Sequence, residues 1–194
     1  MELFDTQGRR LYLMADERAA FLDVAKDADR YVRTFCLVLA YTGCRISEAL
    51  ALSARSFDLS GKAIVFETLK KRRKGVYRAV PVPGAVLDTI SMTHGIKEAQ
   101  KRRKRPKAES PLWDWSRMTA YRRVKELLDA AGIAAGPHKT PKGLRHGYGV
   151  QAISSGVPLN MLSKWMGHAS LEVTAIYANA LGEEQHNIAA RMWI

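Results

Sequence analysis

Cysteine is scarce in this 194-residue sequence, since Cys36 and Cys44 are the only two. Both lie in a stretch with helical hydrophobic spacing, which excludes a secreted fold held together by disulfides, and zinc-binding Cys and His spacings are absent. The longest apolar run, residues 35–41, is too short to cross a bilayer. The start, MELFD, lacks the basic and then apolar segments of a secretory signal. We therefore expect a cytoplasmic protein with no membrane partner.

Acidic residues are few compared with basic ones. Asp and Glu number 19 against 31 Lys and Arg, so the net charge is +12. A domain this basic usually contacts phosphate, most often in nucleic acid. The basic residues are not confined to one amphipathic helix, which argues against a membrane surface. The hydrophobic share of 47% is ordinary for a globular domain and argues against wholesale disorder.

Hydrophobic spacing predicts a mainly α fold with a small antiparallel β-sheet. Helices are expected at residues 17–28, 30–41, 45–52, 85–92, 116–131, 144–154, 159–166, 171–178 and 183–192. Two strands are expected at 63–66 and 77–81, joined by a strongly basic hairpin loop. Residues 97–110 contain almost no apolar side chain and are expected as a solvated loop or the end of a helix. Asp16, Ser116 and Ser170 are the expected N-caps.

Two arginines stand close to the start of a predicted helix. Arg45, within TGCRISE at 42–48, directly follows a buried helix, and Arg145 follows a Pro-Gly turn in the first turn of the next helix. A guanidinium held there can grip two phosphate oxygens, and the free amides of a helix start favour anions. Each arginine also has a plainer interpretation. Arg45 can pair with Glu48 one turn away, and Arg145 can simply be exposed.

A third motif is MGHAS at residues 166–170, followed by Tyr177 nine positions after His168. His168 stands at a predicted helix break, where its ring can point into a cleft. A lone tyrosine on a short helix is ordinarily a packing residue. The order of all three motifs along the chain is what points to a functional site.

Together, TGCRISE, LRH at 144–146, and Gly167-His168 with Tyr177 resemble the catalytic domain of the tyrosine recombinases, the phage integrase family. The resemblance covers residues 15–180 and implies the catalytic-domain fold of these DNA breaking-rejoining enzymes. It also implies a site-specific recombinase or integrase that cleaves and rejoins DNA through a 3′-phosphotyrosine intermediate, without metal or cofactor. Such a protein is expected in the cytoplasm of a bacterium or with a phage, associated with the nucleoid.

The same resemblance assigns the chemistry to particular residues. Tyr177 is the nucleophile, Arg45 and Arg145 hold the non-bridging phosphate oxygens, and His168 donates a hydrogen bond to the phosphate. The general acid is a hairpin lysine, for which Lys70 is the first choice and Lys71 the second.

Three further residues belong to the motifs with other roles. Lys142 replaces a histidine that most relatives carry, so it can contact phosphate but leaves the proton acceptor open. Glu48 is expected to brace Arg45 or His168. His146 is expected to orient the structure, with direct chemistry as the less favoured alternative.

Two basic runs are expected to contact the DNA backbone, although a solvated loop is the plainer interpretation of both. They are Lys71, Arg72, Arg73 and Lys74 in the hairpin, and Lys101, Arg102, Arg103, Lys104 and Arg105 farther on. The expected partner is double-stranded DNA, on which the family forms a homotetramer, while the free protein is expected as a monomer or weak oligomer. We expect one catalytic domain over residues 1–194, without the N-terminal core-binding domain of relatives. The tail at about 182–194 is expected to dock on a neighbouring subunit, or else on its own core.

Two alternatives remain open at this point. A type IB topoisomerase uses the same catalytic residue types, but the short chain and the Gly167-His168 context favour the recombinase. A DNA-binding regulator with a decayed active site would explain Lys142, but the other motif positions are filled.

Overall fold

The computed structural model describes residues 2–67, 75–101, 106–179 and 189–193. Its α-helices are α1 (Ala15–Asp27), α2 (Arg30–Thr42), α3 (Ile46–Leu50), α4 (Gly84–His94), α5 (Ile96–Lys101), α6 (Pro106–Glu109), α7 (Arg117–Ala130), α8 (Pro141–Ser154), α9 (Leu159–Met166) and α10 (Glu172–Ala175). Short 3-10 helices are η1 (Ala54–Ser56), η2 (Ile176–Asn179) and η3 (Ala190–Met192), and the strands are β1 (Phe57–Asp58), β2 (Ala63–Glu67) and β3 (Tyr77–Pro81). None of the described helices is long and apolar enough to cross a membrane.

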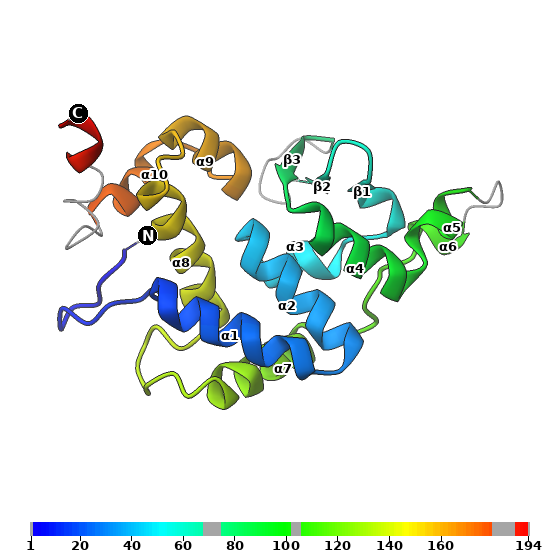
Figure 1. Ribbon diagram of the computed structural model, residues 1–194, viewed down its shortest axis with the longest axis horizontal. Coiled ribbons are helices and arrows are strands. Elements are labelled where there is room, and N and C mark those ends of the chain that lie inside the picture. Colours follow the sequence, from blue (N-terminus) through cyan, green and yellow to red (C-terminus); the bar gives the residue numbers. More distant parts are fainter. Residues whose placement is uncertain (1, 68–74, 102–105, 180–188, 194) are drawn as a thin grey trace.

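Helix α2 lies at the centre of the molecule, in contact with α1, α4 and α8 (Figure 1). The Asp29 side chain caps its start by accepting from the amides of Tyr31 and Val32. Its near-continuous apolar stretch is buried, as expected for a helix covered on several sides. Gly43 ends it with a φ of +59°, and a Cβ there would lie 2.4 Å from the ring of Tyr148. The chain therefore turns sharply just before Arg45.

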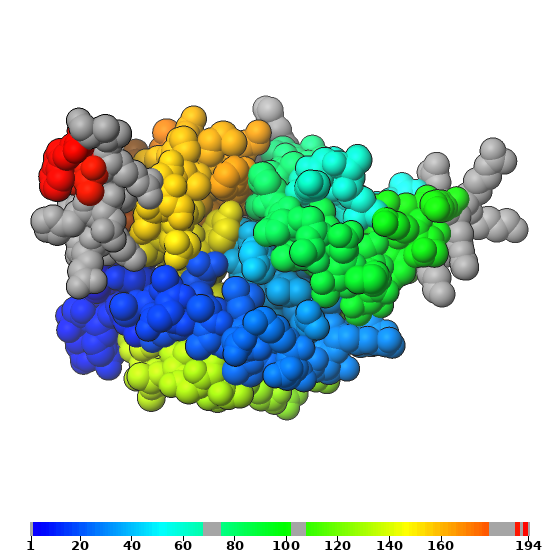
Figure 2. All heavy atoms as spheres, viewed as in Figure 1, coloured from blue at the N-terminus to red at the C-terminus, as the bar shows by residue number. Residues whose placement is uncertain are grey.

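The three strands form an antiparallel sheet in the order β1-β2-β3. In the β2–β3 hairpin Ala63 pairs with Pro81 and Glu67 with Tyr77. Strand β1 is only two residues long, too short for a recognisable alternation, so the sequence did not predict it. The sheet and α4 form one side of the molecule, and α8 and α9 form the other (Figure 2).

Several predicted helix starts need correction. Helix α1 begins at Ala15 after the N-cap Met14, so Asp16 lies in the first turn instead of capping it. Ser170 does not cap α10 either: the N-cap is Leu171, and the Ser170 hydroxyl donates to Glu172 instead. Ser116 does cap α7, since its Oγ accepts from the Thr119 amide at 3.0 Å.

Two regions contain more helix than the sequence predicts. Helix α8 starts at Pro141, three residues before the prediction, because Thr140 Oγ1 caps it by accepting from the Gly143 amide at 3.0 Å. Proline is well suited to the first helical position, where no amide hydrogen is needed. The basic stretch from residue 97 onward, expected as a loop or the end of a helix, contains most of α5 and all of α6, and Ile96 and Ala108 are buried there.

The buried residues form two clusters. The larger surrounds α2 and includes both free cysteines, which are buried. The smaller contains Leu3, Val150, Ala152, Leu162, Met166 and Tyr177. Tyr177, the expected nucleophile, thus belongs to a core cluster at the α8–α9 end of the molecule.

Candidate active site

Arg145 is buried and joins the ends of two helices. Its side chain donates from Nη1 to the carbonyl of Gly43, the C-cap of α2, and from Nη2 to the Met166 carbonyl at 2.9 Å. The last carbonyls of a helix lack intrahelical partners, so a cation is well placed there. Arg145 is the fifth residue of α8 and 5% exposed, so its expected place in the first turn and the alternative of an exposed arginine are both wrong. Its Nε has no hydrogen-bond partner among the described residues.

Arg45 is the N-cap of α3 and is held by Glu48. The carboxylate accepts from the Arg45 amide at 2.8 Å and from Nη1 at 3.1 Å. The ion pair expected as the plainer interpretation of Arg45 is therefore present. It leaves 27% of the Arg45 side chain exposed, so the guanidinium is both braced and accessible.

Arg78, on β3, is a residue that the sequence analysis missed. Its Nη2 lies 2.9 Å from Oε2 of Glu48, and its Nε donates to the Trp165 carbonyl at 2.9 Å. Of the two expected partners of Glu48, Arg45 and His168, the structure shows Arg45, and it adds Arg78 as an unpredicted one. The available signal was the strand alternation, which places Arg78 on the same buried face as Val80.

The guanidinium of Arg78 also explains why position 167 is a glycine. It lies over the ring of Phe66, 4.9 Å from the centroid. A Cβ on Gly167 would come within 2.9 Å of it, and Gly167 has a φ of +64° as the C-cap of α9. The turn that carries His168 is therefore packed directly on Arg78.

Arg45, Arg145 and Lys142 line one cavity of about 500 Å³. Arg117 and Tyr121 of α7 line it too, and neither was predicted. No carboxylate is among the described residues of this lining. Burial, followed by the charge of Arg45, lowers the pKa of Arg145 to about 10, so it stays cationic at neutral pH. The cavity is suited to a phosphate.

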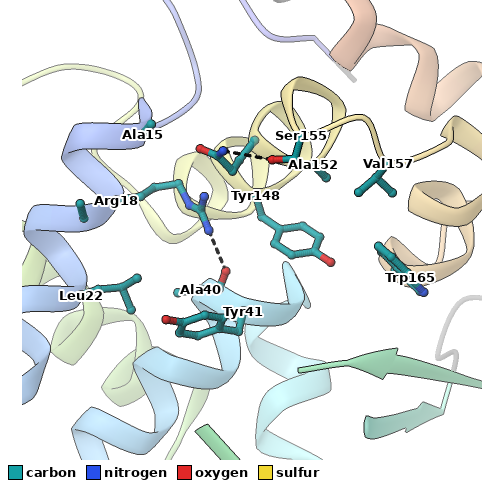
Figure 3. A pocket seen from close by; sticks show the side chains of 12 residues that line it. Ala15, Arg18, Leu22, Ala40, Tyr41, Tyr148, Ala152, Ser155, Val157 and Trp165 are labelled. Carbon is teal, nitrogen blue, oxygen red and sulfur yellow. Dashed lines mark hydrogen bonds between the residues drawn. The ribbon is translucent and has the colours of Figure 1, made fainter. Parts of the chain in front are cut away.

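A second pocket, of about 410 Å³, lies between α1, α2, α8 and α9 and is different in character (Figure 3). Its walls are mostly apolar and include Leu22, Tyr148 and Trp165. Arg18 is the cation of this lining, and its Nη2 donates to the Ala40 carbonyl at 3.0 Å. This pocket is therefore not suited to binding a phosphate.

His168 follows the Gly167 turn. It lies close to the arginines but lines a different cavity. It lines a cavity of about 300 Å³ with Tyr77 and Arg78 of β3 and with Lys164. Its Nδ1 lies 2.8 Å from Oγ1 of Thr174. Burial, followed by the charges of Arg145 and Arg45, lowers the pKa of His168 to about 3. The imidazole is therefore neutral at physiological pH.

Tyr177 is 0% exposed. It lines neither the cavity of Arg45 and Arg145 nor the cavity of His168. Its Oη lies 3.1 Å from Nδ1 of His146, and its ring stacks with His168 at a centroid distance of 6.2 Å. Gly149 makes room for it, since a Cβ there would lie 2.6 Å from the ring. Burial raises the pKa of Tyr177 to about 12, although Arg145 and Arg45 act to lower it. In this conformation the tyrosine is packed as a core residue, next to the charged groups.

His146 is the polar partner of the buried phenol. It is fully buried, and burial, followed by the charges of Lys142 and Arg145, lowers its pKa to about 4. The sequence predicted an orienting role for His146 but not this contact with Tyr177. Lys142 itself is exposed at the start of α8.

Most of the basic-run residues lie outside the described residues. These are Lys70, Lys71, Arg72, Arg73 and Lys74 of the hairpin, and Arg102, Arg103, Lys104 and Arg105. Lys101 is exposed at the end of α5. Much of the tail, residues 180–188, also lies outside the description. Within the described residues, no three His, Cys, Asp or Glu side chains gather as a metal ion requires.

Proteins of known identity resemble this chain in sequence. A resolvase of Escherichia coli (strain K12) is 28% identical over 93% of this chain and 74% of the relative. Tyrosine recombinase XerA of Pyrococcus furiosus is 28% identical over 75% of this chain, which spans about half (49%) of that relative.

Solved structures share the fold. The crystal structure of XerA recombinase has a TM-score of 0.74 at 21% identity and is matched over 93% of this chain and 64% of that one. XerH site-specific recombinase bound to its difH substrate has a TM-score of 0.72 at 19% identity, over 98% of this chain and 60% of that one. The sequence profile of the phage integrase family matches residues 12–184. The chain therefore belongs to the phage integrase family, the tyrosine-type site-specific recombinases.

Proposed function

We propose that this domain cleaves and rejoins double-stranded DNA at specific sites, with Tyr177 as the nucleophile. The observation that carries the proposal is the cavity in which Arg45 and Arg145 meet without a carboxylate in the described lining, beside Tyr177 and His168. Two fixed guanidinium groups match the negative charge that develops on the phosphate oxygens during attack. The XerH structures, described as complexes before and after cleavage of a difH substrate, support DNA as the substrate class.

The proposed reaction is a transesterification. Tyr177 gives its phenolic proton to solvent water once it has left its packed position, its oxygen attacks the phosphorus, and the bond from phosphorus to the 5′-oxygen breaks. That oxygen takes a proton from Lys70, with Lys71 as the alternative, while Arg45, Arg145 and His168 hold the phosphate. Attack by the 5′-hydroxyl of another strand on the 3′-phosphotyrosine then rejoins the DNA.

His146 contacts the phenol through Nδ1, but its properties favour an orienting role. Its pKa of about 4 and the Tyr177 pKa of about 12 make proton transfer between them strongly unfavourable in this arrangement. We therefore assign His146 to orienting the phenol. Lys142 lines the cavity that contains Arg45 and Arg145 and is assigned to phosphate contact.

The proposal requires Tyr177 to move. A fully buried phenol cannot reach a DNA phosphate, so η2 has to shift from its packed position when DNA binds. The segment is suited to this, because α10 and η2 contain only four residues each. Short helices of this kind depend on their packing and not on their own stability.

Because the target sequence is unknown, the test lets the protein select its own substrate. Nicked duplexes of random sequence are incubated with the 194-residue chain, and DNA that stays attached after denaturation is sequenced. The nick lets the cleaved strand diffuse away and so traps the covalent intermediate. We expect an adduct on Tyr177 with the parent and none with Tyr177→Phe. An adduct that persists in Tyr177→Phe would contradict the assignment.

The same assay separates the alternative functions. Adducts on a narrow set of sequences support a site-specific recombinase. Adducts on all sequences, together with relaxation of supercoiled plasmid, favour a type IB topoisomerase. Tight binding to selected duplexes without any adduct favours a non-enzymatic DNA-binding regulator.

For assembly, we propose a homotetramer on DNA in which the tail, about residues 182–194, docks on a neighbouring subunit. Met192 and Trp193 support this, since both are exposed. The mostly apolar pocket of Figure 3 is a receptor of matching character. Deleting residues 183–194 is expected to preserve binding to one site but to abolish the larger complex in sedimentation. Unchanged assembly would favour docking of the tail on its own core.

Three further proposals concern contact with the DNA backbone, domain organisation and location. The two basic runs are assigned to the DNA backbone, so affinity is expected to fall steeply with salt. Residues 1–194 are assigned to one catalytic domain. Because the substrate is DNA, we place the protein at bacterial or phage DNA in the cytoplasm.

A further inference from the structure

Thr174 forms a buried contact between His168 and the helix that leads to Tyr177. It is 0% exposed, it lies in α10, and its Oγ1 is 2.8 Å from Nδ1 of His168. The other ring nitrogen, Nε2, is buried and has no hydrogen-bond partner among the described residues. One atom of the imidazole is therefore engaged by Thr174, and the other remains available to a ligand.

The hydroxyl of Thr174 is used differently from those of other helical threonines. Thr42 Oγ1 donates to the Val38 carbonyl at 2.6 Å, and Thr89 Oγ1 donates to the Ala85 carbonyl at 2.8 Å. Such bonds to the carbonyl four residues earlier are the common pattern in helices. Thr34 Oγ1 also makes one, to the Arg30 carbonyl at 3.0 Å, in addition to its contact with His94. Thr174 Oγ1 contacts the imidazole of His168 and no carbonyl among the described residues. If Thr174 Oγ1 accepted a hydrogen bond from Nδ1–H, its own hydroxyl hydrogen would need another acceptor. A buried donor that is left without an acceptor is costly.

The direction of this hydrogen bond decides what His168 can do. A neutral imidazole carries one proton, on Nδ1 or on Nε2. A proton on Nδ1 would point at Thr174 and leave Nε2 as an acceptor, which cannot donate to a phosphate. A proton on Nε2 makes that nitrogen a donor.

We propose that Thr174 is a positioning residue: its hydroxyl donates to Nδ1 of His168 and so keeps the ring proton on Nε2, ready for the phosphate. The inference rests on the proposed function for the role of His168, but the tautomer itself does not depend on catalysis. Since Thr174 lies three residues before Tyr177, the same bond ties the segment of the nucleophile to the phosphate-binding histidine.

The first test is the tautomer of His168, read from nitrogen NMR of histidine-labelled protein and assigned with His168→Gln. We expect the Nε2–H form in the parent and in Thr174→Ser, which keeps the hydroxyl. Thr174→Val is isosteric without the hydroxyl, and a loss of the Nε2–H preference is expected. A parent ring protonated on Nδ1, or an unchanged tautomer in Thr174→Val, would overturn the proposal.

The second test is single-turnover cleavage of a nicked duplex obtained from the random pool. Thr174→Val is expected to slow cleavage roughly tenfold at unchanged DNA affinity, which is less than the loss of about 100-fold for removing a whole oxyanion donor. Thr174→Ser should restore the rate. In a His168→Gln background, Thr174→Val should cause no further loss, and an equal loss there would show that Thr174 acts by packing alone.

A matched control is available in the same chain. Thr34 is also fully buried, and its Oγ1 lies 2.9 Å from a ring nitrogen, Nε2 of His94, outside the proposed site. It differs from Thr174 in that its hydroxyl donates to the Arg30 carbonyl at 3.0 Å. Thr34→Val should leave the cleavage rate unchanged. If the parent forms no adduct with any DNA, the proposed function fails, and the tautomer measurement still decides the role of Thr174.

Discussion

The arginine side and the tyrosine side of the site are built in different ways. Arg145 joins the ends of α2 and α9, and Arg78 with Glu48 links the sheet to α3. Tyr177 sits on a 3-10 helix of four residues, next to an α-helix of four residues. The charged groups are therefore fixed by bonds between segments that lie far apart in the sequence, whereas the phenol is carried by two consecutive helices of four residues each.

The two sides therefore differ in the free energy needed to move a side chain out of its packed position. Moving an arginine of the cluster would expose helix-end carbonyls or separate a buried ion pair, and both are costly. Moving Tyr177 requires breaking its contact with His146 and unpacking one ring from the smaller core cluster. The account therefore predicts a preformed phosphate site and a nucleophile that is released on DNA binding. The substitutions below test this contrast, in order of their expected effect on the free energy of unfolding.

Arg145→Ala is expected to have the largest effect. It removes the donor to Gly43 and Met166, so the free energy of unfolding should fall by about 4 kcal/mol, and cleavage should fall by at least about 100-fold. Urea unfolding and adduct formation measure the two losses. Arg122→Ala, an exposed arginine of α7, is the control and should change stability little. Full stability in Arg145→Ala would contradict the structural part of the account.

Glu48→Gln tests the ion pair between Glu48 and Arg78 on the arginine side. The free energy of unfolding should fall by about 3 kcal/mol, because Arg78 is left buried without a counter-charge. Burial alone would raise the pKa of Glu48, but Arg78 and the Arg45 amide lower it below the ordinary 4.5. The pair thus stabilises the fold above about pH 4.5, and this contribution disappears as the pH falls through the lowered pKa. Urea unfolding from pH 7 downward should show a weaker acid dependence in Glu48→Gln than in the parent. An identical dependence would mean that the carboxylate is not tied to Arg78.

Gly149→Ala tests the tyrosine side. The new Cβ would overlap the ring of Tyr177, so the packed position should become less stable by about 2 kcal/mol. Tyr177 should then react faster with tetranitromethane, as measured by mass spectrometry of the nitrated peptide. Gly84→Ala, where a Cβ meets no atom closer than 3.9 Å, is the matched control. Equal protection of Tyr177 in Gly149→Ala and the parent would argue against the packed position.

Tyr177→Phe should have the smallest effect on stability. It removes the hydroxyl that faces His146 while keeping the ring, so a loss of about 1 kcal/mol is expected in urea unfolding. Covalent adduct formation should nevertheless be abolished. A large loss of stability would show that the phenol is a structural anchor and not a group poised to leave.

Local signals in the sequence predicted most of the helices. Ser116 marked the start of α7, and the apolar run ending before Gly43 marked α2, because caps and hydrophobic spacing act between neighbours in the chain. The motif order correctly identified the family. Helix α8 was predicted too short because the Gly and Pro residues before Leu144 were assigned to a loop, although Thr140 and Pro141 form a good helix start.

What the sequence could not predict depends on contacts between distant segments. Arg78 belongs to the site because β3 packs on the end of α9. Its partner there, the Trp165 carbonyl, is 87 residues away along the chain. The burial of Tyr177 depends on Gly149 and His146 of α8. Strand alternation can place Arg78 on a buried face, but no sequence pattern identifies its partner or that of Tyr177, so both pairings required coordinates.

The most direct test of the central claim is to follow Tyr177 itself. A fluorotyrosine placed at position 177 reports its surroundings by fluorine NMR, in the free chain and with a nicked duplex recovered from the covalent pool. The account predicts a solvent-shielded resonance in the free protein that moves to a new position when the duplex binds. A resonance that is already solvent-exposed without DNA, or one that stays unchanged while the adduct forms, would contradict it.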